Sequence, residues 1–298
     1  MGRALDVGRR IWAFVWWVRC CGINSAFPFS GRRMFHDLVP CSSGTPDRIR
    51  SGLVMGFFVI VSRRWFPNMS AMVSCIIVAA GRGTRMGPDR DKLFLEVAGA
   101  PVVAHTWRRF CLSPIVDEIV IVVREGMQEV FRELAFQHGF HKPYRLVPGG
   151  AERQDSVWNG LQALSPDAEI VAIQDGARPC TSEAIIANTV QAAREIGAAV
   201  AAQPVTDTIK ESADGVLINR TPDRSRLWAV QTPQAFRVPV IRQALELVRQ
   251  KGLKVTDDTA ACELMGQPVK LVASASPNPK VTIPADLAYI DLLLRQTA

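Results

Sequence analysis

The sequence predicts an α/β fold in which a mainly parallel sheet carries helices on both faces and a β-hairpin arm projects from it. Short and nearly continuous apolar runs are typical of strands that are buried on both faces. Between these runs, apolar residues recur with the 3.6-residue spacing of amphipathic helices. Strands and helices that alternate in this way form βαβ units, so most strands of the sheet should run parallel.

Each expected element corresponds to one such segment. The expected strands are VSCIIVA (73–79), EIVIVV (118–123), YRLV (144–147), EIVAIQ (169–174), AAVAA (198–202) and PVKLVA (268–273). The expected helices are PVVAHTWRRFC (101–111), EGMQEVFRELAFQ (125–137), QDSVWNGLQAL (154–164), SEAIIANTVQAAREI (182–196), VPVIRQALELVRQ (238–250), TDDTAACELMG (256–266) and PADLAYIDLLLRQ (284–296).

One segment, residues 205–228, breaks this alternation. VTDTIKES (205–212) and VLINRTPDRSRLWAV (216–230) predict two extended stretches around a turn, with Asp214 and Gly215 at its tip. An aspartate–glycine pair between extended stretches indicates a β-hairpin. We therefore expect a β-arm over about residues 205–228.

The positive charge of the chain is confined to its first 71 residues. The whole sequence has a formal net charge of +7, and residues 1–71 contain ten Arg, three Asp and neither Lys nor Glu, a balance of +7. Residues 72–298 hold 25 basic and 25 acidic side chains and therefore balance to zero. Because nucleic acids select basic surfaces, we expect no nucleic-acid partner for residues 72–298.

Residues 1–71 differ in composition from the rest, so we expect a boundary near Met72 and one domain over residues 72–298. The apolar runs IWAFVWWV (11–18) and GLVMGFFVIV (52–61) are shorter than the ~20 residues that span a bilayer, so no membrane partner is expected. We expect the extension to be disordered or absent from the mature protein, with translation starting at Met69 or Met72. The alternative is an organelle-targeting peptide, because the segment is rich in Arg and poor in acidic residues.

The cysteines beyond this boundary indicate the redox compartment. They are Cys75, Cys111, Cys180 and Cys262, and they have neither the spacing of a zinc site nor that of a disulfide framework. Unpaired cysteines are typical of a reducing compartment. We therefore expect buried thiols and a cytoplasmic location for the domain.

The loops after the strands carry the candidate site, because ligands of such sheets bind at the carboxyl ends of the strands. In the first loop, AAGRGTR, the glycines Gly81, Gly83 and Gly87 miss the G-x-G-x-x-G dinucleotide fingerprint, since the third comes one residue late. The P-loop pattern G-x-x-x-x-G-K-[ST] is absent as well. The loop combines small residues with Arg85 and Lys92, and two cations at this spacing suit a triphosphate. A plain glycine turn with solvated cations is the alternative for the glycines alone.

The loops PGGAERQDS and DGARPC supply residue types that suit a nucleobase and a metal. Gly149 and Gly150 leave backbone open to the edge of a base, while Asp155 is expected to cap the next helix. Asp175 ends a buried strand, where a carboxylate needs a cation or a metal as its partner. Magnesium is the usual metal at a nucleotide site, so we expect Asp175 to bind Mg²⁺. Arg178 follows closely enough to serve a second phosphate.

In this order, VAAGRGTRM, GGAERQDSV, DGARP, TDTIK, LWAVQTPQAF, VTDDTA and PKVTIPADL resemble the 2-C-methyl-D-erythritol 4-phosphate cytidylyltransferase family. The resemblance covers essentially all of residues 72–298. It implies a Rossmann-like domain and a homodimer formed through the arm. It also implies transfer of CMP from CTP to 2-C-methyl-D-erythritol 4-phosphate, with Mg²⁺ and release of pyrophosphate, in non-mevalonate isoprenoid biosynthesis.

The same resemblance implies roles for individual residues. Arg85 and Lys92 are the implied catalytic residues, which stabilise charge on the α-phosphate. The residues implied to bind CTP are Ala79, Ala80, Gly81, Gly150, Arg153, Ser156 and Asp175. Those implied to hold the acceptor are Arg178, Thr208, Arg224, Thr232, Thr256 and Lys280. Such a set of cations agrees with nucleotidyl transfer, which depends on positioning and charge neutralisation.

One residue departs from the family pattern, and two other functions stay open as alternatives. The family usually has Pro before the lysine where this chain has Asp91, and we expect Asp91 to face solvent or to pair with Arg90. A ribitol 5-phosphate cytidylyltransferase would share the fold and much the same loops. A non-catalytic nucleotide-binding regulator is disfavoured, because binding alone does not require cations at the α-phosphate.

Overall fold

Within residues 71–81 and 91–296, which this computed structural model describes, seven strands form one sheet in the order β5-β4-β1-β6-β8-β7-β9. Its strands are β1 (Met72–Ala79), β4 (Glu118–Val123), β5 (Tyr144–Pro148), β6 (Ala168–Asp175), β7 (Ala198–Pro204), β8 (Trp228–Arg237) and β9 (Lys270–Ala273). β2 (Glu96–Val97) and β3 (Ala100–Pro101) form a separate antiparallel pair. The helices are α2 (Val102–Leu112), α3 (Gln128–Gln137), α4 (Arg153–Gln162), α5 (Glu183–Ile196), α6 (Val238–Gln250), α7 (Asp258–Leu264) and α8 (Asp286–Gln296).

The sheet is mainly parallel, as the alternation of strands and helices predicts. β1 runs parallel to β4 and β6, β4 runs parallel to β5, and β7 runs parallel to β9. Only β8 runs antiparallel to its neighbours in this sheet, β6 and β7. Every residue of β4 is buried, which fits a strand covered on both faces.

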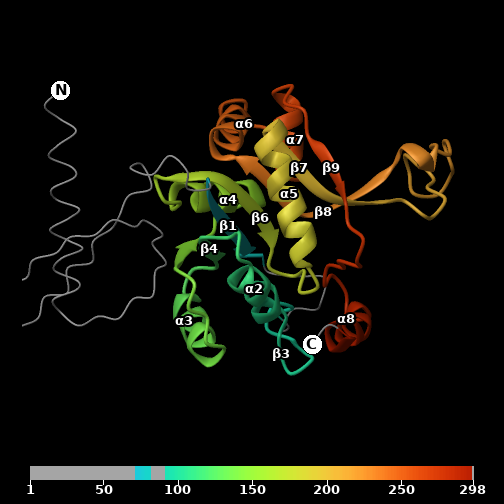
Figure 1. The fold of residues 1–298 in the computed structure, drawn as a ribbon. Helices are drawn as coiled ribbons and strands as arrows, with labels where there is room; N and C mark the ends of the chain where they lie inside the picture. Colours follow the sequence, from blue (N-terminus) through green and yellow to red (C-terminus); the bar gives the residue numbers. More distant parts are fainter. Residues whose placement is uncertain (1–70, 82–90, 297–298) are drawn as a thin grey trace, which may run out of the picture. The chain divides into compact units, whose positions relative to one another are not determined.

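The helices cover both faces of the sheet, and alternate residues of β1 enter two different cores. Cys75 and Ile77 belong to one core, with Trp107 of α2 and Ile186 of α5. Ile76 belongs to the other, with side chains of α4 and α6. This alternation follows from the two-residue period of a strand. The prediction of helices on both faces is confirmed, and Figure 1 shows the arrangement.

Strand β8 is the main element that the sequence did not predict as a whole: the expected extended stretch 216–230 covers only its first residues, 228–230. Its central residues include Thr232 and Gln234, and this polar content hides the apolar pattern of a strand. Both side chains are nevertheless buried and have partners: Thr232 Oγ1 accepts from the backbone N–H of Asp175, and Gln234 donates to Asp257. Polar residues can occupy a central strand when their hydrogen bonds are satisfied inside the protein.

The segment between β7 and β8 projects away from the sheet (Figure 1). Asp214 Oδ1 accepts from the N–H groups of Val216 and Leu217 at 2.8 and 2.9 Å, and Gly215 has a φ of 74°. The turn therefore lies where the Asp214 and Gly215 pair predicts it. Within residues 205–227, one isolated antiparallel bridge, Glu211 to Arg220, joins the two sides, so the regular hairpin stays a prediction.

The cysteine prediction is correct in part. Cys75, Cys111, Cys180 and Cys262 are all free, but Cys111 and Cys180 are only half-buried. Cys111 lies in the last turn of α2 and Cys180 in the loop after β6, where less chain covers them. Burial raises the pKa of Cys180 to about 11 and that of Cys262 to about 12.

The expectations for residues 1–70 concern a segment outside the described residues. In the part of the chain that the structure does describe, no helix is both long and apolar enough to cross a membrane.

Candidate active site

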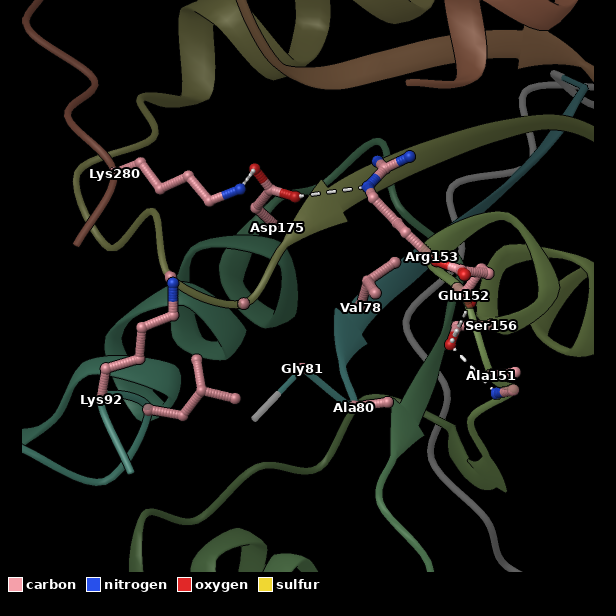
Figure 2. Close-up of a pocket in the computed structure, with 14 residues that line it drawn as sticks. Val78, Ala80, Gly81, Lys92, Ala151, Glu152, Arg153, Ser156, Asp175 and Lys280 are labelled. Atoms are coloured by element: carbon pink, nitrogen blue, oxygen red, sulfur yellow. Dashed lines mark hydrogen bonds and ion pairs between the residues drawn. The ribbon is translucent and has the colours of Figure 1, made fainter. Parts of the chain in front are cut away.

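A pocket of about 460 Å³ lies at the carboxyl ends of β1 and β6 (Figure 2). This is the end of the sheet at which the loop argument places a ligand. The predicted residues that line the pocket are Ala80, Gly81, Lys92, Gly150, Arg153, Ser156, Asp175 and Lys280. The sequence therefore identified most of the side chains that meet there.

The loop before α4 is held in place by Ser156. Its Oγ accepts from the backbone N–H of Gly150 at 3.1 Å and donates to the carbonyl of Glu152 at 3.2 Å. Glu152, and not Asp155, is the N-cap of α4, and the two residues form a capping box in which Asp155 accepts from the N–H of Glu152. The prediction of Asp155 as the N-cap is thus wrong: the N-cap lies three residues earlier, and the carboxylate of Asp155 bonds back to it.

The glycines of this loop are required by close packing. A Cβ atom on Gly149 would lie 2.4 Å from the Cβ of Ala80, and one on Gly150 would lie 2.3 Å from the Cβ of Asp155. The loop after β1 and the loop before α4 therefore approach each other at van der Waals distance. Small residues at Ala80 and Gly149 allow this approach and leave backbone at the wall of the pocket.

Asp175 is the centre of charge in the pocket. Its Oδ2 lies 2.8 Å from Nζ of Lys280 and 3.4 Å from Nε of Arg178, and its Oδ1 lies 3.8 Å from Nε of Arg153. Figure 2 shows Asp175 between Lys280 and Arg153. Burial by itself raises the pKa of Asp175, but Lys280, Arg153 and Arg178 together outweigh it and hold that pKa below its usual value.

Arg153 joins Asp175 to a second buried carboxylate, Asp258, which the sequence analysis did not name. Nη2 of Arg153 lies 2.8 Å from Oδ2 of Asp258, whose side chain is 1% exposed. Burial raises the pKa of Asp258, although Arg153 opposes the shift. The VTDDTA motif gave no signal of this role, since an acidic residue in the first turn of a helix is ordinary and only its burial requires a partner.

Lys92 contacts the segment before α8 beside the pocket. Its Nζ donates to the carbonyl of Val281 at 3.0 Å. Asp91 does not face solvent: its Oδ1 accepts from the N–H of Leu93, and its Oδ2 pairs with Arg124. The alternative partner, Arg90, and the predicted catalytic residue Arg85 lie outside the described residues.

Two predicted acceptor residues lie beside the pocket without lining it. The hydroxyl of Thr232 accepts from the N–H of Asp175, and Arg178 donates to the carbonyl of Asn278 at 2.7 Å. Asn278 was not predicted, yet it is buried and donates through Nδ2 to the carbonyl of Thr232. An isolated asparagine in a loop gives no pattern from which this role could be read.

The remaining predicted residues are not brought into the pocket wall. Ala79 is buried at the end of β1, directly before the lining residue Ala80. Thr208 and Arg224 are exposed on the projecting segment, and Thr256 is exposed before α7. Arg224 donates to the carbonyl of Thr206 within that segment. Thr208, Arg224 and Thr256 therefore do not line the pocket of their own chain, and their contact with the acceptor stays a prediction.

The chemistry of this pocket follows from the groups that converge on it. Lys92, Arg153 and Lys280 supply positive charge, Asp175 supplies a carboxylate, and the glycine loop supplies backbone groups. Anionic phosphates suit the cations, and exposed backbone beside them suits the edge of a base. This pocket, at the carboxyl edge of a Rossmann-like sheet, agrees with the site of a nucleotidyltransferase.

The family described as 2-C-methyl-D-erythritol 4-phosphate cytidylyltransferase, IspD, matches residues 73–296. A relative of that name from Pelotomaculum thermopropionicum is 46% identical over 224 residues, which are 75% of this chain and 94% of the relative. One from Symbiobacterium thermophilum is 45% identical over 232 residues, or 78% and 96% of the two chains. The chain belongs to the IspD family.

Solved structures agree with this assignment. A 4-diphosphocytidyl-2C-methyl-D-erythritol synthase from Anaerococcus prevotii superposes with a TM-score of 0.67 at 31% identity, covering 75% of this chain and 96% of the other. A 2-C-methyl-D-erythritol 4-phosphate cytidylyltransferase from Thermus thermophilus gives 0.63 at 32% identity, with 75% and 99% covered. These similarities do not favour the ribitol 5-phosphate alternative.

Proposed function

We propose that this chain transfers CMP from CTP to 2-C-methyl-D-erythritol 4-phosphate, giving 4-diphosphocytidyl-2-C-methyl-D-erythritol and pyrophosphate. The observation that carries the proposal is that Gly150 of the loop before α4, Lys92, Asp175 and Lys280 line one pocket. Membership of the IspD family supports the identity of the two substrates. The reaction would place the chain in non-mevalonate isoprenoid biosynthesis.

The loop before α4 is proposed to recognise the cytosine. Gly150 presents backbone to the pocket, and the hydrogen bond from its N–H to Ser156 fixes where that backbone lies. Because Ser156 is already engaged twice within the protein, it acts by holding the loop in place. Ala80 and Gly81 leave room for the ribose and the phosphates beside this loop.

The cations are proposed to stabilise the reacting phosphate. An oxygen of the acceptor phosphate attacks the α-phosphorus of CTP, the bond from that phosphorus to the bridging oxygen breaks, and pyrophosphate leaves. Negative charge grows on the α-phosphate during this step, so Lys92 and Arg85 are proposed to contact it. Preorganised charge of this kind typically contributes a factor of about 10² to 10³ in rate.

Asp175 is proposed to hold Mg²⁺ together with the phosphates of CTP. Among residues 71–81 and 91–296, no group of three His, Cys, Asp or Glu side chains could hold a metal alone. Magnesium is commonly bound by one or two carboxylates plus substrate phosphates, so the single carboxylate Asp175 fits this mode. Its Oδ1 lies beyond hydrogen-bond distance of Arg153, and this oxygen suits the metal. When bound, Mg²⁺ would neutralise charge on the phosphates.

The acceptor is proposed to bind on the Lys280 side of Asp175, where Arg178 and Thr232 also lie. Lys280 and Arg178 carry the charge that a sugar phosphate needs.

We propose that two chains form a homodimer through the projecting segment, and that the acceptor binds at the same location in each chain. Exposed apolar side chains at Val216 and Leu217, 81% and 71% accessible, support such a contact.

The dimer proposal also accounts for the position of Thr208 and Arg224. Both lie on the projecting segment, away from the pocket wall of their own chain. We propose that they serve the pocket of the second chain. The test is to mix two inactive variants, Lys92→Ala and Arg224→Ala, and to measure pyrophosphate release. Recovery of activity on mixing is expected; a mixture as inactive as its components, with dimers shown to exchange, contradicts the proposal.

The reaction itself is tested by pyrophosphate release from CTP and Mg²⁺, with 2-C-methyl-D-erythritol 4-phosphate and ribitol 5-phosphate offered in parallel. Release with the first acceptor is expected. Release with ribitol 5-phosphate alone would overturn the choice of acceptor, and release with neither would favour a binding protein.

The free cysteines support a further proposal, that the domain works in a reducing, cytoplasmic compartment.

A further inference from the structure

Asp91 stands directly before Lys92 and makes two different contacts with one carboxylate. Oδ1 accepts from the backbone N–H of Leu93 at 3.1 Å, while the carbonyl of Asp91 accepts from the N–H of Phe94 at 3.0 Å. These bonds close a turn in which Lys92 is the second residue. Aspartate stabilises turns of this type by bonding to backbone two residues ahead.

The other oxygen of Asp91 joins this turn to the central sheet. Oδ2 pairs with Arg124, the residue that directly follows β4. The backbone of Arg124 is held by a hydrogen bond of its own, since its carbonyl accepts from the N–H of Met127 before α3. The preceding residue, Val123, accepts from the N–H of Gly149 in the loop proposed to recognise cytosine. The position of Arg124 is therefore tied to the same strand end as that loop.

The chain after Lys92 is held independently of this contact. Leu93 is buried at the pocket wall, and its carbonyl accepts from the N–H of Val103 in α2. The backbone of Lys92 is thus held after the lysine by the packing of Leu93 and before it by the contacts of Asp91. From this turn, Nζ of Lys92 donates to the carbonyl of Val281, next to the lining residue Lys280. Lysine carries its charge on a flexible four-carbon stem, so the position of its Cα limits where Nζ can lie.

We propose that Asp91 and Arg124 are positioning residues that aim Lys92 at the reacting phosphate. They act through Lys92 and do not contact the substrates themselves. The inference rests on the proposed function, in which Lys92 stabilises charge on the α-phosphate. It gives a role to the carboxylate of Asp91: its ion pair with the residue after β4 restrains the backbone from which Lys92 extends.

The experiment separates the ion pair from the turn. Asp91→Asn keeps an oxygen for the N–H of Leu93 but loses the charge that faces Arg124, and Arg124→Ala removes the partner. Each variant should lower kcat about tenfold, as expected for a small misplacement of a catalytic group. KM for CTP should change by less than about threefold, because neither substitution alters the loop before α4 that is proposed to recognise cytosine. The matched control is Arg132→Ala, which breaks the exposed pair with Glu129 on α3 and should leave kcat unchanged.

The double variant provides the decisive comparison. If both residues act through one contact, Asp91→Asn combined with Arg124→Ala should be no slower than the slower single variant. Rates are normalised to the folded fraction, measured by thermal unfolding. Wild-type kcat in both single variants, effects that multiply in the double variant, or a change confined to KM would each overturn the proposal. Lys92→Ala is measured alongside: full activity in that variant would refute the proposed role of Lys92 itself, whereas a slow Lys92→Ala with normal Asp91→Asn and Arg124→Ala would refute only the positioning.

Discussion

A methyl group added at Gly150 should impair CTP use far more than it impairs folding. The new Cβ would lie 2.3 Å from the Cβ of Asp155 and 3.1 Å from its carbonyl carbon. Carbon atoms rest at about 3.5 Å or more, so the loop must move by about 1 Å. Asp155 cannot yield easily, since its carboxylate caps the N–H of Glu152 at the start of α4. The displacement therefore falls on Gly150 and on its bond to Ser156.

The expected result for Gly150→Ala is a fall of about 100-fold in kcat/KM for CTP, the size associated with a misplacement of about 1 Å. Most of the loss should appear in KM, because the loop binds the base and does not contact the reacting phosphate. The assay is steady-state pyrophosphate release at varied CTP with saturating acceptor. Thermal unfolding of the same preparation reports whether the domain is folded.

Gly160→Ala is the matched control, since it adds a methyl group within α4, the helix that follows the loop of Gly150, at a position that does not line the pocket. Its Cβ would lie 2.8 Å from Cγ2 of Ile76 and 3.1 Å from Cγ2 of Val122, inside the core. Overpacking of this kind costs about 1 to 3 kcal/mol, and each kcal/mol lowers Tm by about 2 to 4 °C in a domain of this size. A normal KM for CTP in Gly150→Ala, or an equal rise of KM in Gly160→Ala, would refute the reasoning.

Three further predictions concern charge and packing. Lys92→Ala should lower kcat by a factor of about 10² to 10³ with little change in KM for CTP; kinetics with equal losses in kcat and CTP binding would count against a transition-state role. Asp175→Asn should destabilise the domain by about 3 kcal/mol at pH 7, because it removes the buried carboxylate that Arg178, Arg153 and Lys280 share. The pKa of Asp175 is held below its usual value, so its contribution to stability is present above the unfolded pKa of about 3.9 and is lost as pH falls through the folded pKa. Urea unfolding of the wild type and of Asp175→Asn should therefore show that the difference in their free energies of unfolding closes below about pH 4. A difference that stays constant with pH would contradict this. Trp107→Ala should cost about 3 to 5 kcal/mol in denaturant unfolding, since Trp107 is fully buried against the ring of Phe140, while KM for CTP stays normal; an altered KM would show that this core reaches the pocket.

The layers of the fold could be predicted because burial leaves a local record in the sequence. β4, with all of its residues buried, reads as an unbroken apolar run, and α5 repeats its apolar residues at helical spacing. Strand β8 could not be recognised in this way. Its buried Thr232 and Gln234 are tolerated only because distant backbone and carboxylate groups complete their hydrogen bonds.

The candidate site was predictable to the extent that its residues follow strands. Gly150, Asp175 and their neighbours stand directly after apolar runs, so the rule for the carboxyl edge of a sheet finds them. Asp258 and Asn278 escaped this rule, because Asp258 begins a helix and Asn278 lies in a loop far along the chain. Thr208 and Arg224 lie on the projecting segment, where motif resemblance names residues but gives no position.

The sequence by itself determined that strands and helices alternate around a mainly parallel sheet, where the loops of the pocket lie along the chain and which kind of ligand their residues suit, because periodicity and residue type act locally. Only the tertiary structure decided which charges meet. Lys92 reaches the carbonyl of Val281, 189 positions away, and Asp91 pairs with Arg124, the residue after another strand. Such contacts are made by packing between distant segments, and no spacing along the chain records them.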